Sequence, residues 1–385
     1  MKHEEILHRC FRCGYCKLPS DYTDFNCPSY LQFRFETYSP GGRMWLLRAW
    51  LNQEIETSSR FEEILFSCAA CGNCVEHCAF PEFKADLLDT FISGREELVN
   101  KGTVPPSVRD YLKAMSVHGN PYKLSENQRL DWAEGLDLES YNGQEYLFFI
   151  GCAGTFDERG QKMARAVARQ LKNRGVSFGI LGAEERCDGN EVRTLGEVGL
   201  FEELAKNNVQ LFQDKGIEKI ITLSPHAYHA IKNEYPKFGG TYQVYHYSHV
   251  LSDLIEGEEN YKNETPLKVT FHDPCYLGRH NWEYQAPRKI LETLPGVELE
   301  EMDRVKADAL CCGGGGGNFY TDVLGGGADS SARVRVREAV QTGAEVLAVA
   351  CPKCAKMFED AIKAEDLEED FRVMDLAEII ETRFE

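Results

Sequence analysis

The residues best suited to chemistry in this chain are its cysteines, of which there are fifteen among 385 residues. Thirteen of them fall into three groups whose spacing is typical of metal ligands. The groups are Cys10, Cys13, Cys16 and Cys27; Cys68, Cys71, Cys74 and Cys78; and Cys275, Cys311, Cys312, Cys351 and Cys354. Iron–sulfur clusters need thiolates in such numbers, because each iron keeps tetrahedral sulfur coordination. The sequence therefore predicts a protein that moves electrons.

The first two groups have the spacing of bacterial ferredoxins, in which three cysteines hold one cluster and a fourth reaches across to another. The second group is Cys-x2-Cys-x2-Cys-x3-Cys, and the first repeats its triplet, although Cys27 follows only after ten residues. Pro28 comes directly after Cys27, as the motif requires, so we keep Cys27 as a ligand. Crossed ligation predicts one [4Fe–4S] cubane on Cys10, Cys13, Cys16 and Cys78, and a second on Cys68, Cys71, Cys74 and Cys27. Structural zinc is the alternative, but pairs of Cys-x2-Cys would suffice for zinc.

The third group supplies five thiolates, whereas a cubane uses four. Five thiolates at one site indicate either a spare redox thiol or a cluster that is not a simple cubane. The run Gly313–Gly317 follows the adjacent pair Cys311-Cys312 and lacks the Lys-Ser/Thr of a phosphate-binding loop. We expect these glycines to let backbone N–H groups approach cluster sulfides. His272 and His280 flank Cys275 and are candidate proton donors, with hydrogen bonding beside the metal site as their alternative role.

The elements that must position these cysteines repeat along the chain. We expect a helical two-cluster domain over residues 1–83, with a helix at 43–56, and a helical connector over 84–145. Strand, helix and cysteine-containing turn then follow in the same order in two repeats, 146–265 and 266–385. Such alternation predicts parallel sheets covered by helices, with ligands beyond the carboxyl ends of the strands. The expected fold class is therefore α+β and α/β, with two tandem Rossmann-like α/β domains after the helical part.

The first repeat has lost most of its ligands. Cys152 and Cys187 remain, but Asp188, Ser224 and Ala227 stand where the other cysteines belong. Two thiolates with an aspartate and a serine do not suit a thiolate-bound four-iron cluster. We interpret Cys152 and Cys187 as vestigial ligands that now serve as core thiols, as a dithiol, or as thiolates beside a partner's cofactor.

These motifs resemble the cysteine-rich CCG domain of heterodisulfide reductases. The resemblance covers nearly the whole chain. The chain is similar to the soluble part of the D-type subunit, without a membrane anchor. It is carried by the cysteine groups and by the strings Ser39-Pro-Gly-Gly-Arg43, Phe271-His-Asp-Pro-Cys-Tyr-Leu-Gly-Arg279 and Ala350-Cys-Pro-Lys-Cys354. The resemblance implies that the five cysteines of the third group bind a non-cubane [4Fe–4S] cluster. Iron–sulfur subunits of glycolate oxidase and anaerobic glycerol-3-phosphate dehydrogenase are similar in arrangement.

The resemblance implies an oxidoreductase subunit that works within a multi-subunit, heterodisulfide-reductase-like complex. The sequence shows no flavin or nucleotide fingerprint, so we expect a heterodisulfide reductase A-like flavoprotein and other redox subunits as partners. The loss of ligands in the first repeat favours an electron relay, for example in an anaerobic benzoyl-CoA-reductase-type complex. The alternatives are an iron–sulfur subunit of a glycolate/lactate or glycerol-3-phosphate dehydrogenase and a zinc-stabilised scaffold without a redox role.

Composition indicates which partners the protein binds and where in the cell it is located. The net charge of −19 disfavours binding to nucleic acid or to anionic membrane surfaces. The longest apolar runs have the length of strands, which predicts no membrane insertion, and the start of the chain lacks the apolar region of a secretory signal. Many cysteines without an export signal favour metal sites in a reducing compartment, so we expect a cytoplasmic location.

Overall fold

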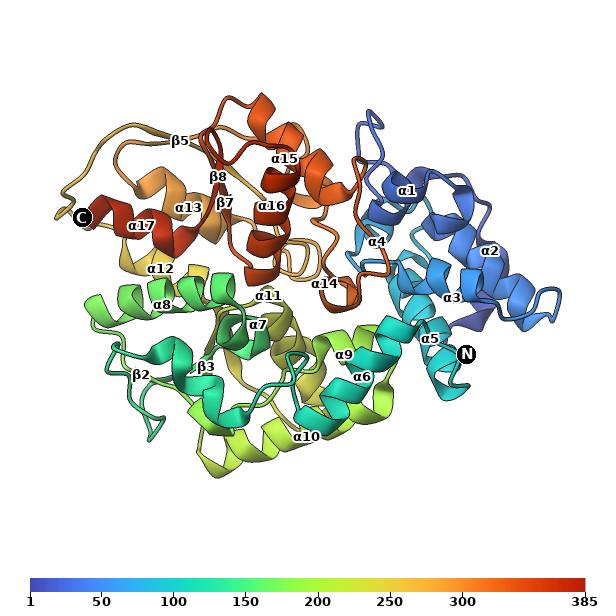
Figure 1. The fold of residues 1–385 in the computed structure, drawn as a ribbon, viewed down its shortest axis with the longest axis horizontal. Helices are drawn as coiled ribbons and strands as arrows, with labels where there is room; N and C mark the ends of the chain where they lie inside the picture. The colour runs from blue at the N-terminus through green and yellow to red at the C-terminus, as the bar shows by residue number, and fades with distance from the viewer. Residues whose placement is uncertain (385) are drawn as a thin grey trace. The chain divides into compact units, whose positions relative to one another are not determined.

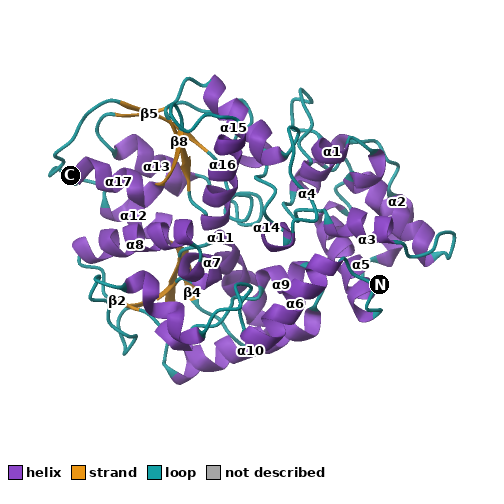
Figure 2. Ribbon diagram, in the orientation of Figure 1, coloured by secondary structure: helices purple, strands orange, loops and turns teal. Residues whose placement is uncertain are grey.

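The computed structural model describes residues 1–384, which form two compact units that do not follow the order of the chain. The first unit comprises residues 1–113, 191–199 and 304–335, and the second comprises residues 114–190, 200–303 and 336 onwards. Figure 1 shows the chain coloured along its length, and Figure 2 shows its helices and strands. The segment with Cys311 and Cys312 therefore belongs to the same unit as the two ferredoxin-type groups.

The first unit begins with a segment, residues 1–113, in which the regular elements are all helical. The predicted helix at 43–56 is confirmed, but it starts earlier and ends earlier, at Leu51. It starts earlier because the hydroxyl of Ser39 accepts a hydrogen bond from the N–H of Gly42 and Pro40 occupies the first helical position. The α-helices are α1 (Pro28–Phe33), α2 (Pro40–Leu51), α3 (Ser59–Phe66), α4 (Asn73–His77), α5 (Leu87–Asn100) and α6 (Pro106–His118), with α9 (Asn190–Thr194), α14 (Asn318–Thr321) and α15 (Ser331–Gln341) from later in the chain. Of these, α6, α9 and α15 also include residues of the second unit.

The second unit contains two four-stranded parallel sheets with the same strand order, β2-β1-β3-β4 and β6-β5-β7-β8. Leu147 pairs with Ile220 in the first sheet, and Val269 pairs with Val346 in the second. The predicted internal repeat of parallel α/β units is confirmed by this shared topology. The strands are β1 (Tyr146–Phe149), β2 (Phe178–Gly179), β3 (Lys219–Thr222), β4 (Gln243–His246), β5 (Leu267–Phe271), β6 (Val297–Leu299), β7 (Val346–Val349) and β8 (Arg372–Asp375).

Helices cover the sheets because the strands are apolar on both faces. Leu147 and Phe148 are fully buried in β1, as are Val346 and Leu347 in β7. The helices of the unit are α7 (Gly151–Phe156), α8 (Glu158–Asn173), α10 (Val198–Asp214), α11 (Pro225–His229), α12 (Tyr247–Leu254), α13 (Gln285–Thr293), α16 (Pro352–Ala364) and α17 (Leu376–Phe384). In the chain, α8 and α13 follow β1 and β5, in the strand-then-helix order that the sequence predicts for both repeats.

The two repeats pack against each other through α8, which contacts α16 and α17 (Figure 1). Arg159 of α8 donates two hydrogen bonds to the carboxylate of Glu378, at 2.7 and 2.6 Å, and Arg169 binds Glu381 in the same bidentate way. Bidentate pairs of this kind fix orientation as well as adding stability.

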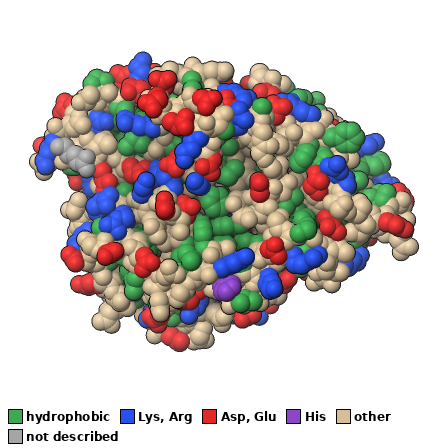
Figure 3. Space-filling view, in the orientation of Figure 1, with side chains coloured by type: hydrophobic (Ala, Val, Ile, Leu, Met, Phe, Trp, Pro, Cys, Tyr) green, Lys and Arg blue, Asp and Glu red, His purple; other side chains and the backbone are tan. Residues whose placement is uncertain are grey.

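Acidic and basic side chains are interspersed over the face that Figure 3 shows.

Asp375, at the end of β8, is fully buried and accepts a hydrogen bond from the hydroxyl of Tyr247 in the other repeat. Burial raises the pKa of Asp375 to about 7. Because the folded pKa lies above the unfolded one, ionisation opposes folding, and stability falls as pH rises from about 4 to about 7. We therefore expect Asp375→Asn to raise the free energy of unfolding by roughly 2–4 kcal/mol at pH 8, with little effect at pH 4.

Denaturant unfolding at the two pH values measures this difference. The exposed Asp370→Asn is the matched control, because it removes the same charge just before β8 without relieving burial. An equal gain at both pH values for Asp375→Asn would show that the carboxylate is not destabilising in the folded protein.

Candidate iron–sulfur centres

Two cavities in the first unit are lined by cysteines. The first is lined by apolar side chains, including Phe11, Phe80 and Met44. Its four cysteines are Cys10, Cys13, Cys16 and Cys78. The structure thus brings Cys78, from the second cysteine run, to the triplet of the first run. This is the set that crossed ligation predicts for the first cluster.

The second cavity lies between α4, α5 and the start of α1. Leu88 and Phe91 of α5 form its apolar wall. Its cysteines are Cys27, Cys68, Cys71 and Cys74, together with Cys16, which lines both cavities. The structure therefore places Cys27 with the second triplet, despite the ten residues that separate it from Cys16.

The thiols in these cavities fit a bound cation. Burial raises the pKa of Cys10, Cys16, Cys27, Cys74 and Cys78. Thiols held neutral in this way lose their protons to a metal, which supplies the positive charge that compensates the thiolates. Four sulfurs around an apolar hollow are the donor set of a [4Fe–4S] cluster, and a bound cluster would supply one-electron redox chemistry at each cavity.

The Ser39–Arg43 string positions Cys27. The buried guanidinium of Arg43 donates to the carbonyl oxygens of Tyr38 and Ile64 and to the hydroxyl of Ser29, which lies 3.5 Å from the Cys27 sulfur. Gly42 is required beside it, because a Cβ there would lie 2.0 Å from the carbonyl oxygen of Glu36. The string therefore ties α1, α2 and α3 together around the second cavity.

Arg95 of α5 joins the second ferredoxin-type loop to the glycine run. Its guanidinium, 1% exposed, donates to the carbonyl oxygens of Cys68 at 2.6 Å, Leu65 at 2.8 Å and Thr194 at 2.7 Å. It also reaches the carbonyl oxygen of Gly316 at 3.3 Å. Sequence reasoning missed Arg95, because one arginine in an amphipathic helix gives no sign of contacts with segments so distant in the chain.

The glycine run has two roles in the structure. The N–H of Gly313 donates to the thiol sulfur of Cys311 at 3.4 Å, while the expected approach of these glycines to cluster sulfides stays a prediction. Gly316 instead packs against the second ferredoxin-type loop, where an added Cβ would lie 2.3 Å from the carbonyl oxygen of Cys68. The loop that carries Cys311 and Cys312 therefore lies directly against the backbone of a predicted cluster ligand.

The other three cysteines of the third group lie in the second unit, beyond the carboxyl ends of β5 and β7. Cys351 precedes the first residue of α16, Cys354 lies in its first turn, and Cys275 follows β5. All three are buried. Cys311 and Cys312, also buried, belong to the first unit, so the convergence of all five cysteines on one cluster stays a prediction.

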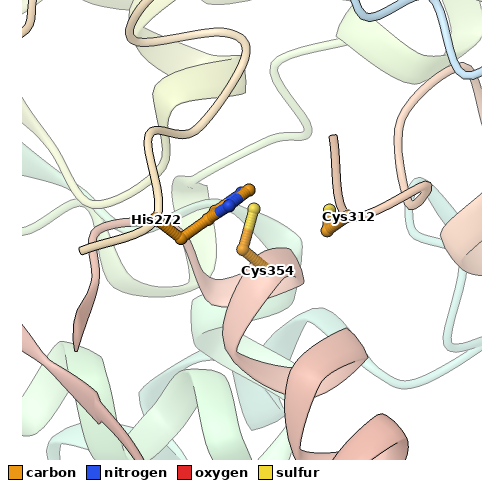
Figure 4. A group of neighbouring side chains, drawn as sticks. All are labelled: His272, Cys312 and Cys354. Carbon is orange, nitrogen blue, oxygen red and sulfur yellow. The ribbon is translucent and has the colours of Figure 1, made fainter. Parts of the chain in front are cut away.

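The two candidate histidines have different surroundings. His272 follows β5, is fully buried, packs edge-on against Phe358 and has a ring nitrogen within 4.8 Å of the Cys354 sulfur. Figure 4 shows its ring beside that sulfur and also draws Cys312 of the first unit. His280 stacks on Tyr276, with ring centroids 4.1 Å apart. His272 is thus placed to support the third group, while a proton-donating role for either histidine stays a prediction.

In the first repeat, Cys152 lies in the first turn of α7 and Cys187 in the loop before α9, and both are buried. Their thiols hydrogen-bond to each other. A nitrogen of Arg129, from the 3-10 helix Glu126–Ala133, lies 3.8 Å from the Cys152 sulfur. Sequence reasoning missed Arg129 as well, because it lies in the connector, outside both repeats.

Comparison with known proteins agrees with this arrangement. A family model described as "4Fe-4S dicluster domain" matches residues 6–80, and one described as "Cysteine-rich domain" matches residues 146–232 and 269–359. Fold and cysteine sites thus define an iron–sulfur protein with one dicluster domain and two cysteine-rich domains. A solved structure of a hypothetical protein from Helicobacter pylori shares the fold, with a TM-score of 0.59 and 13% identity over 100% of this chain and 73% of that one.

Relatives identify the family more closely. The D-type subunit of the dihydromethanophenazine:CoB–CoM heterodisulfide reductase of Methanosarcina barkeri is 30% identical over 97% of this chain and 93% of the relative. The chain belongs to this heterodisulfide reductase D-type family of cysteine-rich-domain iron–sulfur oxidoreductases.

Two longer relatives match over 83% of this chain: the "Probable iron-sulfur-binding oxidoreductase FadF" of Bacillus subtilis, 36% identical, and the "EtfAB:quinone oxidoreductase" of Syntrophomonas wolfei, 35% identical. The match covers 46% of each of these two relatives, so the chain spans about half their length. Within residues 1–384, every helix falls short of the length and apolar character needed to cross a membrane.

Proposed function

We propose that the chain is an electron-transfer subunit of a multi-subunit, heterodisulfide-reductase-like oxidoreductase. In this proposal, electrons pass between a flavoprotein partner and a terminal acceptor through two ferredoxin-type clusters and one cluster of the cysteine-rich domain. The observation that carries the proposal is the pair of cysteine-lined cavities, with Cys78 in the first and Cys27 in the second. The dicluster match over residues 6–80 favours iron over structural zinc at both.

We further propose the ligand sets and domains that the sequence predicts. The first cluster is held by Cys10, Cys13, Cys16 and Cys78, the second by Cys68, Cys71, Cys74 and Cys27, and the third, a non-cubane [4Fe–4S] cluster, by Cys275, Cys311, Cys312, Cys351 and Cys354. The two cysteine-rich matches support the division into repeats after residue 145 and near residue 266, each with the proposed Rossmann-like character. The first repeat carries no cluster, because Asp188, Ser224 and Ala227 replace its ligands.

The packing of the loop that carries Cys311 and Cys312 supports a relay. The loop of Cys311 and Cys312 packs through Gly316 on the backbone of Cys68, and Arg95 bonds to both segments. A short distance between redox centres is what electron transfer along a chain of clusters requires. The relay role is therefore favoured over independent cleavage of a disulfide by the same chain.

Anaerobic purification from the native source tests the proposal. We expect about twelve irons per chain, four for each of three clusters, and a co-purifying flavoprotein of the heterodisulfide reductase A type. Metal analysis, EPR spectroscopy and identification of the co-purified chains measure these outcomes on one sample.

Each alternative gives a different result on that sample. A hydroxy-acid or glycerol-3-phosphate dehydrogenase as partner would replace the proposed complex by the alternative one. Zinc in place of iron would support the alternative of a zinc-stabilised scaffold without a redox role. About sixteen irons would mean that the first repeat also holds a cluster.

A further inference from the structure

The first repeat retains a thiol pair that the proposed electron relay does not use. Cys152 and Cys187 are 5% and 7% exposed, and they come from different elements of the second unit, α7 and the loop that leads to α9. Their side chains hydrogen-bond to each other. Two buried thiols that interact with each other, well apart in sequence and outside the predicted ligand sets, are candidates to form a disulfide.

A buried charge network surrounds Cys152. The guanidinium of Arg129, 1% exposed, has one nitrogen 3.8 Å from the Cys152 sulfur and another 3.8 Å from the carboxylate of Glu185. That carboxylate accepts hydrogen bonds from the N–H groups of Ile150 and Gly151, at 3.0 and 2.8 Å. Burying a guanidinium is costly unless anions compensate it. The Nε of Arg129 also pairs with the carboxylate of Glu126, so two carboxylates compensate the guanidinium. The remaining contact, with the Cys152 sulfur, places Arg129 to stabilise a negative charge on Cys152.

Cys187 has different surroundings. Its sulfur accepts a hydrogen bond from the N–H of Gly189 at 3.4 Å, and its carbonyl oxygen accepts one from the side chain of Asn208. The hydrogen bond from Cys187, aided by Arg129, lowers the pKa of Cys152, whereas the same hydrogen bond and burial raise the pKa of Cys187. One thiol favoured as thiolate beside one favoured as protonated thiol is typical of reactive dithiols.

Two other roles fit the site less well. Cysteines that only fill a core need no buried arginine beside them. A mononuclear metal site needs further ligands, and among residues 1–384 no imidazole, carboxylate or third thiol joins this pair in a set of three ligand atoms within 4.8 Å of one another.

We propose that Cys152 and Cys187 are a redox-active dithiol that stores two electrons. Its oxidation forms one S–S bond between the Cys152 thiolate and the Cys187 thiol, breaks the S–H bond of Cys187, releases that proton to water and gives up two electrons. The acceptors are one-electron iron–sulfur centres that each take one electron, so this role as a store rests on the proposed function. A two-electron dithiol in the same chain as one-electron carriers would let the chain exchange electrons in pairs. The proposal that the two thiols form a redox-active dithiol does not depend on the iron–sulfur centres.

Mass spectrometry of the holoprotein tests for the dithiol. The anaerobically purified chain is equilibrated with dithiothreitol mixtures from fully reduced to fully oxidised, and with diamide as a stronger oxidant. It is then quenched in acid, alkylated and digested. We expect a Cys152–Cys187 linked peptide to replace the two alkylated peptides as the mixture becomes more oxidising. Both peptides alkylated under every condition, diamide included, would overturn the proposal, whatever the iron content of the sample.

Counting electrons tests the store. On titration of the oxidised holoprotein with dithionite, wild type should take up about two electrons more per chain than Cys152→Ser or Cys187→Ser, at equal iron content. Ser224→Ala, a change in the same half-site whose hydroxyl bonds only to the N–H of His226 among the contacts described, should match wild type. Equal uptake in all variants, with the linked peptide present in wild type, would overturn the electron store while leaving the relay intact.

Arg129 is a positioning residue in this proposal, and its replacement should change the thiol–disulfide equilibrium. Arg129→Gln removes the charge that stabilises the thiolate of the reduced form, so at pH 8 the ratio of reduced to oxidised dithiothreitol at half-oxidation should rise on the order of tenfold. Arg165→Gln is the control, because Arg165 bonds to the backbone of Trp132 in the same 3-10 helix. An unchanged ratio in Arg129→Gln would overturn the assignment of Arg129.

Discussion

Replacing Cys27 with alanine should remove about four irons per chain, which makes this one of the largest effects that the structure predicts. Cys27 lines the second cavity with Cys68, Cys71 and Cys74, and a cubane that loses one of four thiolates loses a ligand to one iron. Iron analysis and EPR spectroscopy of the anaerobically purified variant measure the loss. Cys187→Ser is the control and should keep the full iron content, because Cys187 lies in the first repeat.

Double variants then distinguish crossed ligation from ligation within each run. Cys27→Ala combined with Cys68→Ala should lose no more iron than either single variant, because both residues line one cavity. Cys27→Ala combined with Cys10→Ala should lose about eight irons, because Cys10 lines the other cavity. The reverse pattern would mean that Cys27 completes the cluster of its own run and that the crossed sets are wrong.

The cysteine cavities and the repeated sheets were predictable because their patterns are local. Cys78 ends a run whose spacing alone indicates that it crosses to another cluster, and the structure places it with Cys10. Apolar runs of strand length, each followed by a cysteine, predicted β1 and β5 and hence the shared strand order of the two sheets. Short cysteine spacings and strand periodicity can be recognised in a single sequence, because they depend on neighbouring residues.

Contacts between distant segments were not predictable in the same way. Arg95 bonds to carbonyl oxygens of Cys68, Thr194 and Gly316, and nothing near Arg95 in sequence marks these partners. Arg129 reaches Cys152 from the connector for the same reason. The division into compact units shows the consequence, because residues 304–335 join the ferredoxin-type segment although the sequence repeat assigns them to the last domain.

The glycine run shows how one pattern can serve two needs. Its position after Cys311 and Cys312 predicts that backbone N–H groups approach cluster sulfides, and the N–H of Gly313 donates to the thiol sulfur of Cys311. A run of five glycines is longer than that role requires. Gly316 and Gly317 are explained by packing, since a Cβ on Gly316 would meet Cys68 and one on Gly317 would meet Leu195. The sequence thus marked the segment, while only the fold shows what lies against each glycine.

Gly316→Ala should therefore have a large effect on the first unit. The new Cβ would lie 2.3 Å from the carbonyl oxygen of Cys68, and Gly316 has a φ of +60°, which disfavours alanine. Because the obstacle is backbone, relief requires the loop of Cys311 and Cys312 to move away from the second ferredoxin-type loop. We expect a loss of about 3 kcal/mol or more in the free energy of unfolding. Denaturant unfolding of the anaerobic holoprotein, followed by cluster absorbance, measures it.

Gly326→Ala is the matched control for this change. It places the same methyl group ten residues further along the same segment, where no atom lies within 4 Å of the new Cβ. We expect its free energy of unfolding to stay within about 0.5 kcal/mol of that of wild type. If Gly316→Ala behaved like Gly326→Ala, the close packing of the two loops would be wrong. If Gly316→Ala lost stability while the partner still reduced every cluster rapidly, the close packing of the two loops would be supported. The role of that packing in the electron relay would then be wrong.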